Sequence, residues 1–580
     1  MKKAQIKKSV SALAMAAVIA VSLFGYGCGA KSASTSSDAG VSGDFTGTAK
    51  GFGGDVSVTL TLTDGAITGC TAEGKDETEG VGSQAIAKMP GEIAESGSIA
   101  VDGVSGATLT STAIKEAAAA ALTAAGLNPD DYKTAVENNA TAEDSTVDAD
   151  VVVVGAGGAG MTAAITAAAE GKSVVILESQ SMVGGNSVRA TGGMNAGKTV
   201  YQDENEFGES AGVEKTLKTA AEKYADNETI TALAKTVSEQ WAAYQANPTG
   251  YFDSVELMEL DTMIGGKGIN DPELVETLCA NSADAIDWLD EHGITLHNVS
   301  SFGGASVKRI HRPVNAEGKT VSVGSYMIPL LEENCEKAGV QMMLNTTATE
   351  ILTDDNGVAV GIKATGASGE TITINAKAVI LTSGGFGANM DMVVEYKPEL
   401  KGFMTTNAPG ILGQGIKMAQ AIGADTVDMD QIQIHPTVQY DSASLITEGL
   451  RGDGAVLINS EGKRFIDEVG TRDVVSAAEI AQPGSYSWLI IDQKMVDDSS
   501  VIQGYIKKGY TFEGKTYEEL AEQIGVDGAA LAETMNTWNG YVEAKNDPDF
   551  GRTSFATSWI PLPTTAIKVT ARCASHHRVA

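Results

Sequence analysis

The sequence predicts an α/β protein in which a Rossmann-like domain carries an inserted α+β capping domain and follows a smaller α+β domain. Three observations predict this architecture. The apolar run 151–154 leads through a glycine-rich turn and an Ala-rich helix to a second apolar run at 173–177, the order of a strand–helix–strand unit with a buried parallel sheet. Residues 56–74 alternate apolar and polar side chains around an Asp-Gly pair, which is typical of a β-hairpin. The composition changes again from about Gln431, so a third unit begins there.

The bulk composition limits the function classes. A chain of 580 residues is too long for one hydrophobic core, so several domains are expected. Its 75 acidic and 41 basic side chains give a net charge of −34, which repels nucleic acid, so no nucleic-acid partner is expected. Four cysteines beyond residue 30 show no paired spacing, so we predict no disulfide framework and no metal site. The absence of a Cys-x-x-Cys-His motif excludes covalently attached haem.

Residues 1–30 have the pattern of a targeting segment. Four lysines precede the apolar run 10–24, and small residues then lead to Cys28. This order resembles a bacterial lipoprotein signal, so we expect an exported protein with a lipid on Cys28 that holds it to the outer face of the cytoplasmic membrane. Simple secretion and an uncleaved anchor are the alternatives. Residues 31–43 are rich in Ser, Gly and Ala, which is typical of a flexible tether.

The first predicted domain spans residues 44–127, and the polar stretch 128–147 is interpreted as a linker. The turn Asp102-Gly103-Val104-Ser105-Gly106-Ala107-Thr108 lies just ahead of an expected helix. A hydroxyl at a helix N-terminus suits a phosphate, and the alternative is that Thr108 is an ordinary N-cap. The turn resembles the attachment motif of small FMN-binding domains. That resemblance implies covalent FMN on Thr108, added by a flavin transferase.

The second domain, residues 148–430, opens with a dinucleotide-binding pattern. Glycines after a strand and before a helix let backbone amides approach a pyrophosphate. Glu178, which lies 18 residues beyond the last glycine, is placed to accept ribose hydroxyls. The alternative is a glycine-rich turn without a ligand. The turn comprises Gly155, Ala156, Gly157, Gly158, Ala159 and Gly160.

A second glycine-rich run, residues 184–195, distinguishes a site for FAD from a site for NAD. Together with the segments 382–387 and 406–410 it resembles the flavoprotein subunits of fumarate reductase and succinate dehydrogenase, over residues 148–570. The resemblance implies non-covalently bound FAD. Gln414 departs from the family, where Asp is more frequent. The implied FAD contacts, beyond the first turn, are Gly185, Asn186, Ser187, Thr191, Gly192, Gly193, Ala348, Gly384 and Gly385.

The predicted capping domain, residues 431–570, carries the candidate catalytic residues. Their order resembles that of soluble fumarate reductases, which implies that Arg472 donates a proton to the substrate. An arginine pairs a carboxylate with its fork and stays cationic, so it can act as an acid only if its proton is replaced in concert. Taken singly, these residues would be read as a structural histidine and ordinary ion pairs. The implied roles are substrate binding by His435, Thr447 and Glu448, and proton relay by Glu448 and Arg451.

The whole pattern predicts an exported reductase of a C=C bond conjugated to the carboxylate of a small, fumarate-like acid. We expect a membrane or extracellular donor to supply electrons through FMN to FAD. A urocanate or other enoate reductase is the alternative substrate class, and a non-catalytic electron-transfer flavolipoprotein or a carboxylate sensor is the alternative of another kind. Family members continue beyond residue 570 with a His-His-containing stretch that returns to the FAD domain. Here His576 and His577 resemble that step in surroundings that do not fit, so we expect an atypical tail at 571–580 in place of the closing FAD segment.

Overall fold

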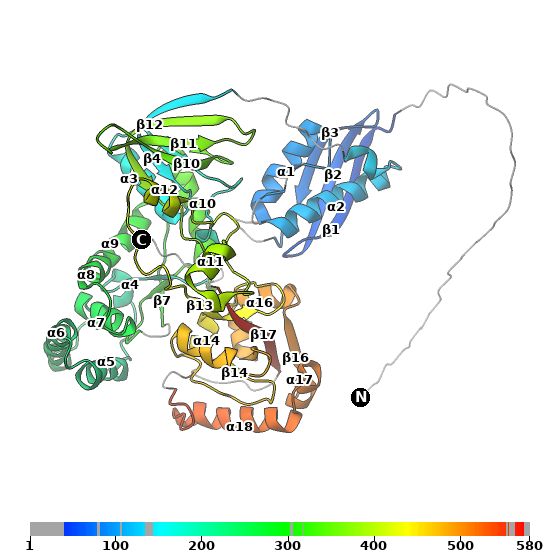
Figure 1. The fold of residues 1–580 in the computed structure, drawn as a ribbon. Helices are drawn as coiled ribbons and strands as arrows, with labels where there is room; N and C mark the ends of the chain where they lie inside the picture. Colours follow the sequence, from blue (N-terminus) through cyan, green and yellow to red (C-terminus); the bar gives the residue numbers. More distant parts are fainter. Residues whose placement is uncertain are drawn as a thin grey trace, which may run out of the picture.

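The protein is described by a computed structural model that covers residues 40–77, 82–101, 103–104, 107–133, 143–301, 305–316, 318–552, 555 and 563–573. The predicted signal with Cys28, most of the tether and residues 574–580 lie outside the described residues. Figure 1 shows three units: a small domain at one side, a domain around a larger sheet, and a third unit below both. The predicted fold class is confirmed.

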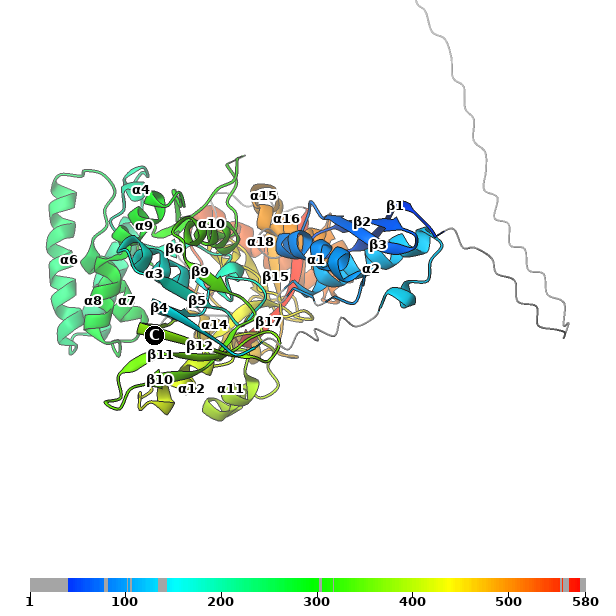
Figure 2. The same ribbon diagram turned by 90° about the horizontal axis from the view of Figure 1, so that it is seen from above.

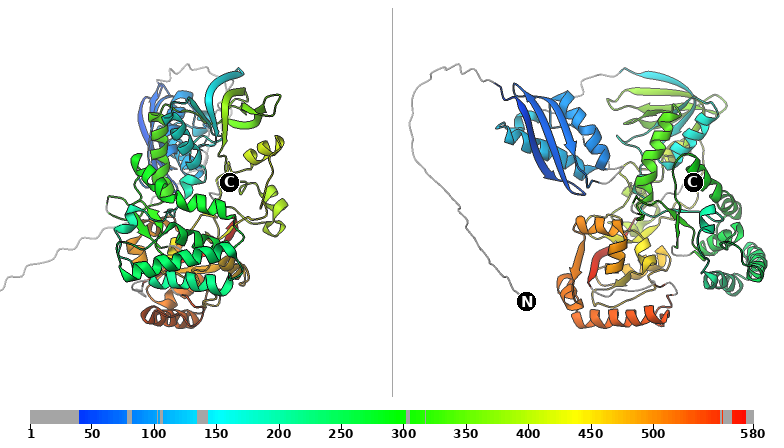
Figure 3. Two further views of the ribbon diagram at one scale, coloured as in Figure 1. Left: turned by 90° about the vertical axis from the view of Figure 1, so that its left-hand side faces the viewer. Right: turned by 180° about the vertical axis from the view of Figure 1, so that it is seen from behind.

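The small domain is an antiparallel sheet covered on one face by two helices (Figure 3). Val56, Val58, Leu60 and Leu62 alternate along the middle strand and are buried against the helices. A 3-10 helix, η1 (Pro129–Tyr132), follows, and its Tyr132 carbonyl accepts the Ile99 amide at 2.9 Å. The first residues of the expected linker therefore pack on this domain. Its other elements are β1 (Gly43–Lys50), β2 (Asp55–Thr63), β3 (Ala66–Glu73), α1 (Gly82–Ser96) and α2 (Thr108–Ala124).

The second domain is built on a six-stranded sheet in the order β10-β11-β12-β4-β5-β9. The strands β12, β4, β5 and β9 run parallel, as their apolar sequences predict, and β10 and β11 form an antiparallel edge. Bounds are β4 (Ser145–Val154), β5 (Val174–Leu177), β9 (Gln341–Met343), β10 (Thr347–Thr353), β11 (Ala359–Thr365) and β12 (Thr371–Leu381).

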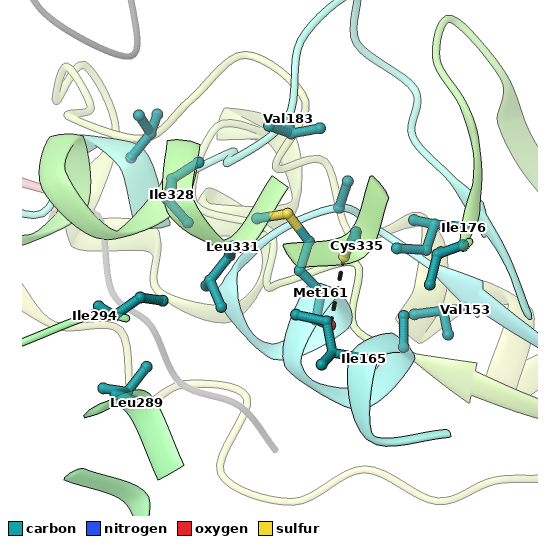
Figure 4. Packing of buried hydrophobic residues seen from close by; sticks show 14 of the residues in the cluster. Val153, Met161, Ile165, Ile176, Val183, Leu289, Ile294, Ile328, Leu331 and Cys335 are labelled. Carbon is teal, nitrogen blue, oxygen red and sulfur yellow. Dashed lines mark hydrogen bonds between the residues drawn. The ribbon is translucent and has the colours of Figure 1, made fainter. Parts of the chain in front are cut away.

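Two helices pack on the parallel part of this sheet, α3 (Gly158–Ala169) and α10 (Val323–Lys337). Figure 4 shows Met161 and Ile165 of α3 facing Leu331 of α10 and the strand residues beneath. The Cys335 thiol donates to the Met161 carbonyl at 3.7 Å. This core holds α3 against the ends of β4 and β5, where the glycine-rich turn lies.

A helical segment extends the second domain away from the small domain (Figure 2). A short sheet in the order β6-β8-β7 connects it to the rest. Its elements are η2 (Ser187–Arg189), β6 (Met194–Asn195), α4 (Val200–Asp203), α5 (Ser210–Lys223), α6 (Glu228–Ala246), α7 (Val255–Gly265), α8 (Pro272–Ala280), α9 (Ser282–Glu291), β7 (Asn298–Ser300) and β8 (Ile310–Arg312). After β12 the chain continues through α11 (Met390–Tyr396), η3 (Pro398–Leu400) and α12 (Gln414–Ala421).

The capping unit is a sheet in the order β13-β17-β15-β14, with β16 also paired to β17. Its central strand β17 (Thr564–Cys573) includes residues 571–573, so part of the expected tail belongs to this sheet. The other strands are β13 (Ile434–Gln439), β14 (Val456–Ile458), β15 (Ser487–Asp492) and β16 (Thr511–Gly514). The helices are α13 (Gly449–Asp453), α14 (Arg472–Ile480), α15 (Gln493–Asp498), α16 (Ser500–Lys507), α17 (Tyr517–Ile524) and α18 (Gly528–Ala544).

The small domain contacts both of the other units. Met182 of the second domain is buried in the hydrophobic cluster of the small domain, and the Lys88 ammonium donates to the Ser181 carbonyl at 2.8 Å. On the capping side, the Lys508 ammonium lies 3.9 Å from the ring centre of Phe52. Among the described residues, no helix has both the length and the apolar character needed to cross a bilayer.

Candidate active site and flavin sites

The glycine-rich turn lies between β4 and α3, at the carboxyl edge of the parallel strands. Gly155 has φ +106°, and a Cβ there would lie 2.6 Å from the Thr382 carbonyl oxygen. A Cβ at Gly160 would lie 1.9 Å from the Gly155 carbonyl oxygen. Both positions therefore require glycine, and the N-terminus of α3 is brought to the point where an open α/β sheet binds a pyrophosphate.

Glu178 lies directly after β5 and is buried beside this turn. Its Oε2 accepts the Ala156 amide at 2.9 Å, and its Oε1 accepts the Gln180 amide at 2.9 Å. Burial raises the pKa of Glu178, although these amides favour the charged form. The residues of the turn therefore fit a dinucleotide, with the acid at the position expected for the ribose.

The second glycine-rich run packs against the first. The Ser187 hydroxyl accepts the Gly158 amide at 3.1 Å, and Asn186 Oδ1 accepts the Ala408 amide at 2.7 Å. Cβ atoms at Gly185 and Gly384 would both lie within 4 Å of Ile411 Cδ1, whereas Gly385 faces open space. The segments 155–160, 185–187 and 384–385 therefore lie together, although they are far apart in the sequence.

The remaining predicted FAD contacts lie around this group. Ala348 is buried in β10, in a cluster that also contains Val154 and Leu177. Thr191 and Gly192 are half-buried on the way to β6, and a Cβ at Gly193 would lie 2.4 Å from the His311 carbonyl oxygen. This close backbone approach requires glycine at position 193 whether or not the residue contacts FAD.

The candidate FMN position lies at the start of α2. The helix begins at Thr108, and its N-cap is Ala107, which makes no side-chain capping bond. Thr108 is thus the first helical residue, which disfavours its interpretation as the N-cap. Asp102, Ser105, Gly106 and the side chain of Thr108 lie outside the described residues. None of the described side chains caps this helix N-terminus, and such an N-terminus fits a phosphate group.

Glu77 connects the start of α2 to the strand loop at 51–54. It accepts the Thr110 hydroxyl on one carboxylate oxygen, and the other oxygen accepts the Gly53 amide at 2.9 Å. Sequence reasoning did not identify Glu77, which lies outside the turn motif.

In the capping unit, Glu448 lies between two arginines. Arg472 donates to Glu448 Oε2 from Nε at 2.8 Å and from Nη2 at 2.5 Å, and Arg451 Nη2 donates to Glu448 Oε1 at 2.7 Å. Arg451 is 1% exposed, whereas Arg472 lies at the first residue of α14 and is partly exposed. Arg472, Glu448 and Arg451 are therefore in direct contact, with Glu448 between the two arginines.

The charges around Glu448 determine its protonation. Burial opposes ionisation of this carboxyl, but the two guanidinium groups outweigh it and lower its pKa from 4.5 to about 2. His435 adds a smaller effect of the same sign, which places it near the relay. It is 3% exposed, and its Nδ1 accepts the Thr437 amide at 3.2 Å. Thr447 precedes Glu448, and its hydroxyl accepts the Gly449 amide at 3.4 Å.

Several residues of this site were not predicted. Gln433 Oε1 accepts a hydrogen bond from Arg472 Nη1 at 2.9 Å, which orients the guanidinium. Arg312 of the second domain approaches the site, because a Cβ at Gly449 would lie 3.0 Å from its Nη2. Both come from segments without a motif, so the sequence alone carried no signal for them.

A buried ionic cluster supports Arg451 from behind. Glu468 accepts Arg464 Nε at 2.8 Å and Arg552 Nη1 at 3.1 Å. Its carbonyl accepts Arg451 Nη1 at 2.6 Å, and Arg552 Nη2 donates to the Arg451 carbonyl at 2.7 Å. Of these contacts, the sequence could have suggested only the ion pair between Arg464 and Glu468, because those two residues are four positions apart.

Comparisons with known proteins agree with this arrangement. A family model described as FAD binding domain matches residues 150–252 and 240–577, and one described as FMN-binding domain matches residues 51–123. The structure of the open conformation of a flavocytochrome c3 fumarate reductase has a TM-score of 0.54 at 33% identity, covering 74% of this chain and 67% of that one.

Curated relatives extend the comparison. The chain is 38% identical over 403 residues to Fumarate reductase (cytochrome) of Shewanella frigidimarina, covering 70% of this chain and 62% of the relative. It is 37% identical over 454 residues to NADH:fumarate oxidoreductase of Klebsiella pneumoniae (strain 342), covering 78% and 43%. Urocanate reductase of Eggerthella lenta is 34% identical over 543 residues, covering 90% and 81%. The chain thus spans less than two thirds of the length of the first two relatives. It belongs to the FAD-binding flavoprotein family of these fumarate and urocanate reductases, with an FMN-binding domain before its FAD-binding domain.

Proposed function

We propose that the protein reduces the C=C bond of a small acid in which that bond is conjugated to a carboxylate, with fumarate as the favoured substrate. The observation that carries the proposal is the chain of contacts Arg472–Glu448–Arg451. It lies beside His435 and Thr447 in the capping unit, and the FAD-binding domain lies against that unit. A urocanate or other enoate reductase is the second candidate, because relatives include a Urocanate reductase and the NADH:acrylate oxidoreductase of Vibrio harveyi.

The residues of the site suit this chemistry. FAD, when bound, supplies the hydride. The neighbouring carbon needs a proton, and negative charge develops on the substrate carboxylate in between. We assign the binding of that carboxylate to His435 and Thr447, and to the Arg472 guanidinium both the stabilisation of the charge and the holding of the proton. Because Glu448 stays ionised, it can pass a proton from Arg451 to Arg472 in concert with the loss from Arg472.

We propose further that Thr108 carries covalent FMN, attached by a flavin transferase, and that electrons from a membrane or extracellular donor enter through the small domain. Support comes from Met182, which is buried in the small domain two residues before the FAD-side glycines Gly184 and Gly185. The Lys88 contact to Ser181 joins the same segment. Export and a lipid on Cys28 remain part of the proposal, because an external electron path fits a protein outside the cell.

The test uses the full chain coexpressed with a flavin transferase. The flavins are reduced anaerobically, and their absorbance is followed after fumarate, acrylate or urocanate is added. We expect rapid reoxidation by one acid and the formation of its saturated product. Arg472→Ala should lower this rate by about 10³-fold or more while FAD stays bound, and the exposed control Lys463→Ala should not change it. Bound flavins without reoxidation by any acid would identify a non-catalytic electron carrier instead.

A further inference from the structure

A second carboxyl group lies behind the relay and has no part in the contacts described above. Glu479 is fully buried in α14, the helix whose first residue is Arg472. Seven residues separate the two, which is about two helical turns, so they lie along one face of the helix. Glu479 is therefore placed by the same helix that places the proton donor.

Glu479 is only partly satisfied within the described part of the chain. The Ser487 hydroxyl of β15 donates to Glu479 Oε1. Glu479 Oε2 is buried without a hydrogen-bond partner among the described residues, and so is Arg451 Nε. The charges of Glu479 and Arg451 act on each other, but no hydrogen bond joins the two side chains among the described residues, so a proton passing between them requires a bridging water. The other charged group that acts on Glu479 is Arg572 of β17.

Glu479 is neutral at pH 7, whereas the three relay residues are charged. Complete burial raises its pKa from 4.5 to about 8, and this effect exceeds the opposing effects of Ser487, Arg451 and Arg572. Glu479 is thus a neutral acid at pH 7. Arginine, by contrast, keeps its proton far above that pH, and Glu448 keeps its charge far below it.

We propose that Glu479 is the proton-holding residue behind the relay, and that it acts through Arg451. The inference rests on the proposed reductase function. In the balanced step, Arg472 gives its proton to the substrate carbon, and Arg451 replaces that proton through Glu448. The Glu479 carboxyl then returns a proton to Arg451 through a bridging water and becomes a carboxylate. Solvent restores the Glu479 proton before the next turnover, so each reduction consumes one hydride and one proton.

The test compares Glu479→Gln with wild type and with Glu533→Gln, which replaces an exposed glutamate of α18. Glutamine keeps the oxygen that accepts the Ser487 hydrogen bond but holds no transferable proton. We expect kcat to fall by about 10²-fold with KM unchanged, and Glu479→Asp to recover part of the loss. In wild type, kcat should fall as pH rises through about 8, and in Glu479→Gln this dependence should disappear.

An infrared measurement gives a second readout that does not require turnover. The carbonyl stretch of a protonated carboxylic acid should appear in the difference spectrum between wild type and Glu479→Gln, vanish from that difference above pH 8, and be unaffected by Glu533→Gln. An unchanged band or an unchanged pH profile in Glu479→Gln would overturn the inference while leaving the reductase function intact. Failure of wild type to reduce any of the three acids would overturn the proposed function and the relay with it, and the infrared band would then report only a buried acid.

Discussion

Replacement of Glu448 by glutamine tests the electrostatics of the site most directly. The change removes the charge that pairs with Arg451 and Arg472 and keeps the shape of the side chain. A pKa lowered from 4.5 to about 2 corresponds to about 3 kcal/mol of stabilisation of the charged form at neutral pH. Since Glu448→Gln also leaves the buried Arg451 guanidinium without its carboxylate, we expect a loss of about 3 kcal/mol or more.

The sign of the pH dependence follows from the lowered pKa. The stabilisation by Glu448 is complete above pH 4.5 and is lost as pH falls through about 2. The difference in unfolding free energy between wild type and Glu448→Gln should therefore be largest at neutral pH and shrink on acidification.

The assay is native-state hydrogen exchange of peptides from the capping unit, because unfolding of the whole multidomain chain is not a single transition. The exposed control Glu461→Gln, which breaks a surface pair with Lys463, should change stability by less than about 1 kcal/mol. Equal protection of wild type and Glu448→Gln, or a difference that does not vary with pH, would refute the reasoning.

Three further predictions concern the supporting residues. Gly155→Ala requires a Cβ 2.6 Å from the Thr382 carbonyl oxygen, so the purified protein should lose FAD, which its absorbance after gel filtration would show; full retention would contradict the assigned turn. Glu468→Gln breaks the buried pairs with Arg464 and Arg552 and should lower the stability of the capping unit by about 3–5 kcal/mol in native-state hydrogen exchange, and a loss below about 1 kcal/mol would argue against the cluster. Thr108→Ala should abolish the FMN mass adduct on intact protein, whereas Thr123→Ala at the other end of α2 should keep it.

Local sequence signals predicted the glycine-rich turn because its conformation is fixed within one segment, whereas the roles of the relay residues came from resemblance to a family. The folded chain requires glycine at position 155, as the dinucleotide-binding pattern predicted. Glu448 and Arg451 are three residues apart, so a single helical turn brings them together. Arg472 comes from a separate helix, and resemblance to a family rather than spacing identified it. The FMN motif predicted a helix near Thr108, and the helix begins there.

Residues without a motif required the tertiary structure. Gln433 contacts Arg472 only because β13 and α14 pack together, and Arg312 approaches Gly449 from another domain. Residues 571–573 looked atypical as a sequence, yet they extend β17, because a strand is stabilised by its neighbours' backbone as well as by its own side chains.

The sequence by itself therefore determined the fold class and the glycine positions of the first turn, because these depend on backbone conformation along one segment, whereas resemblance to a family identified the relay residues. Only the tertiary structure decided which of these groups are charged. Glu448 and Glu479 are the same residue type, but two guanidinium groups keep Glu448 ionised, whereas complete burial keeps Glu479 protonated at neutral pH. The free energy of a charge depends on what surrounds it in space, and that is set by packing between segments distant in the chain.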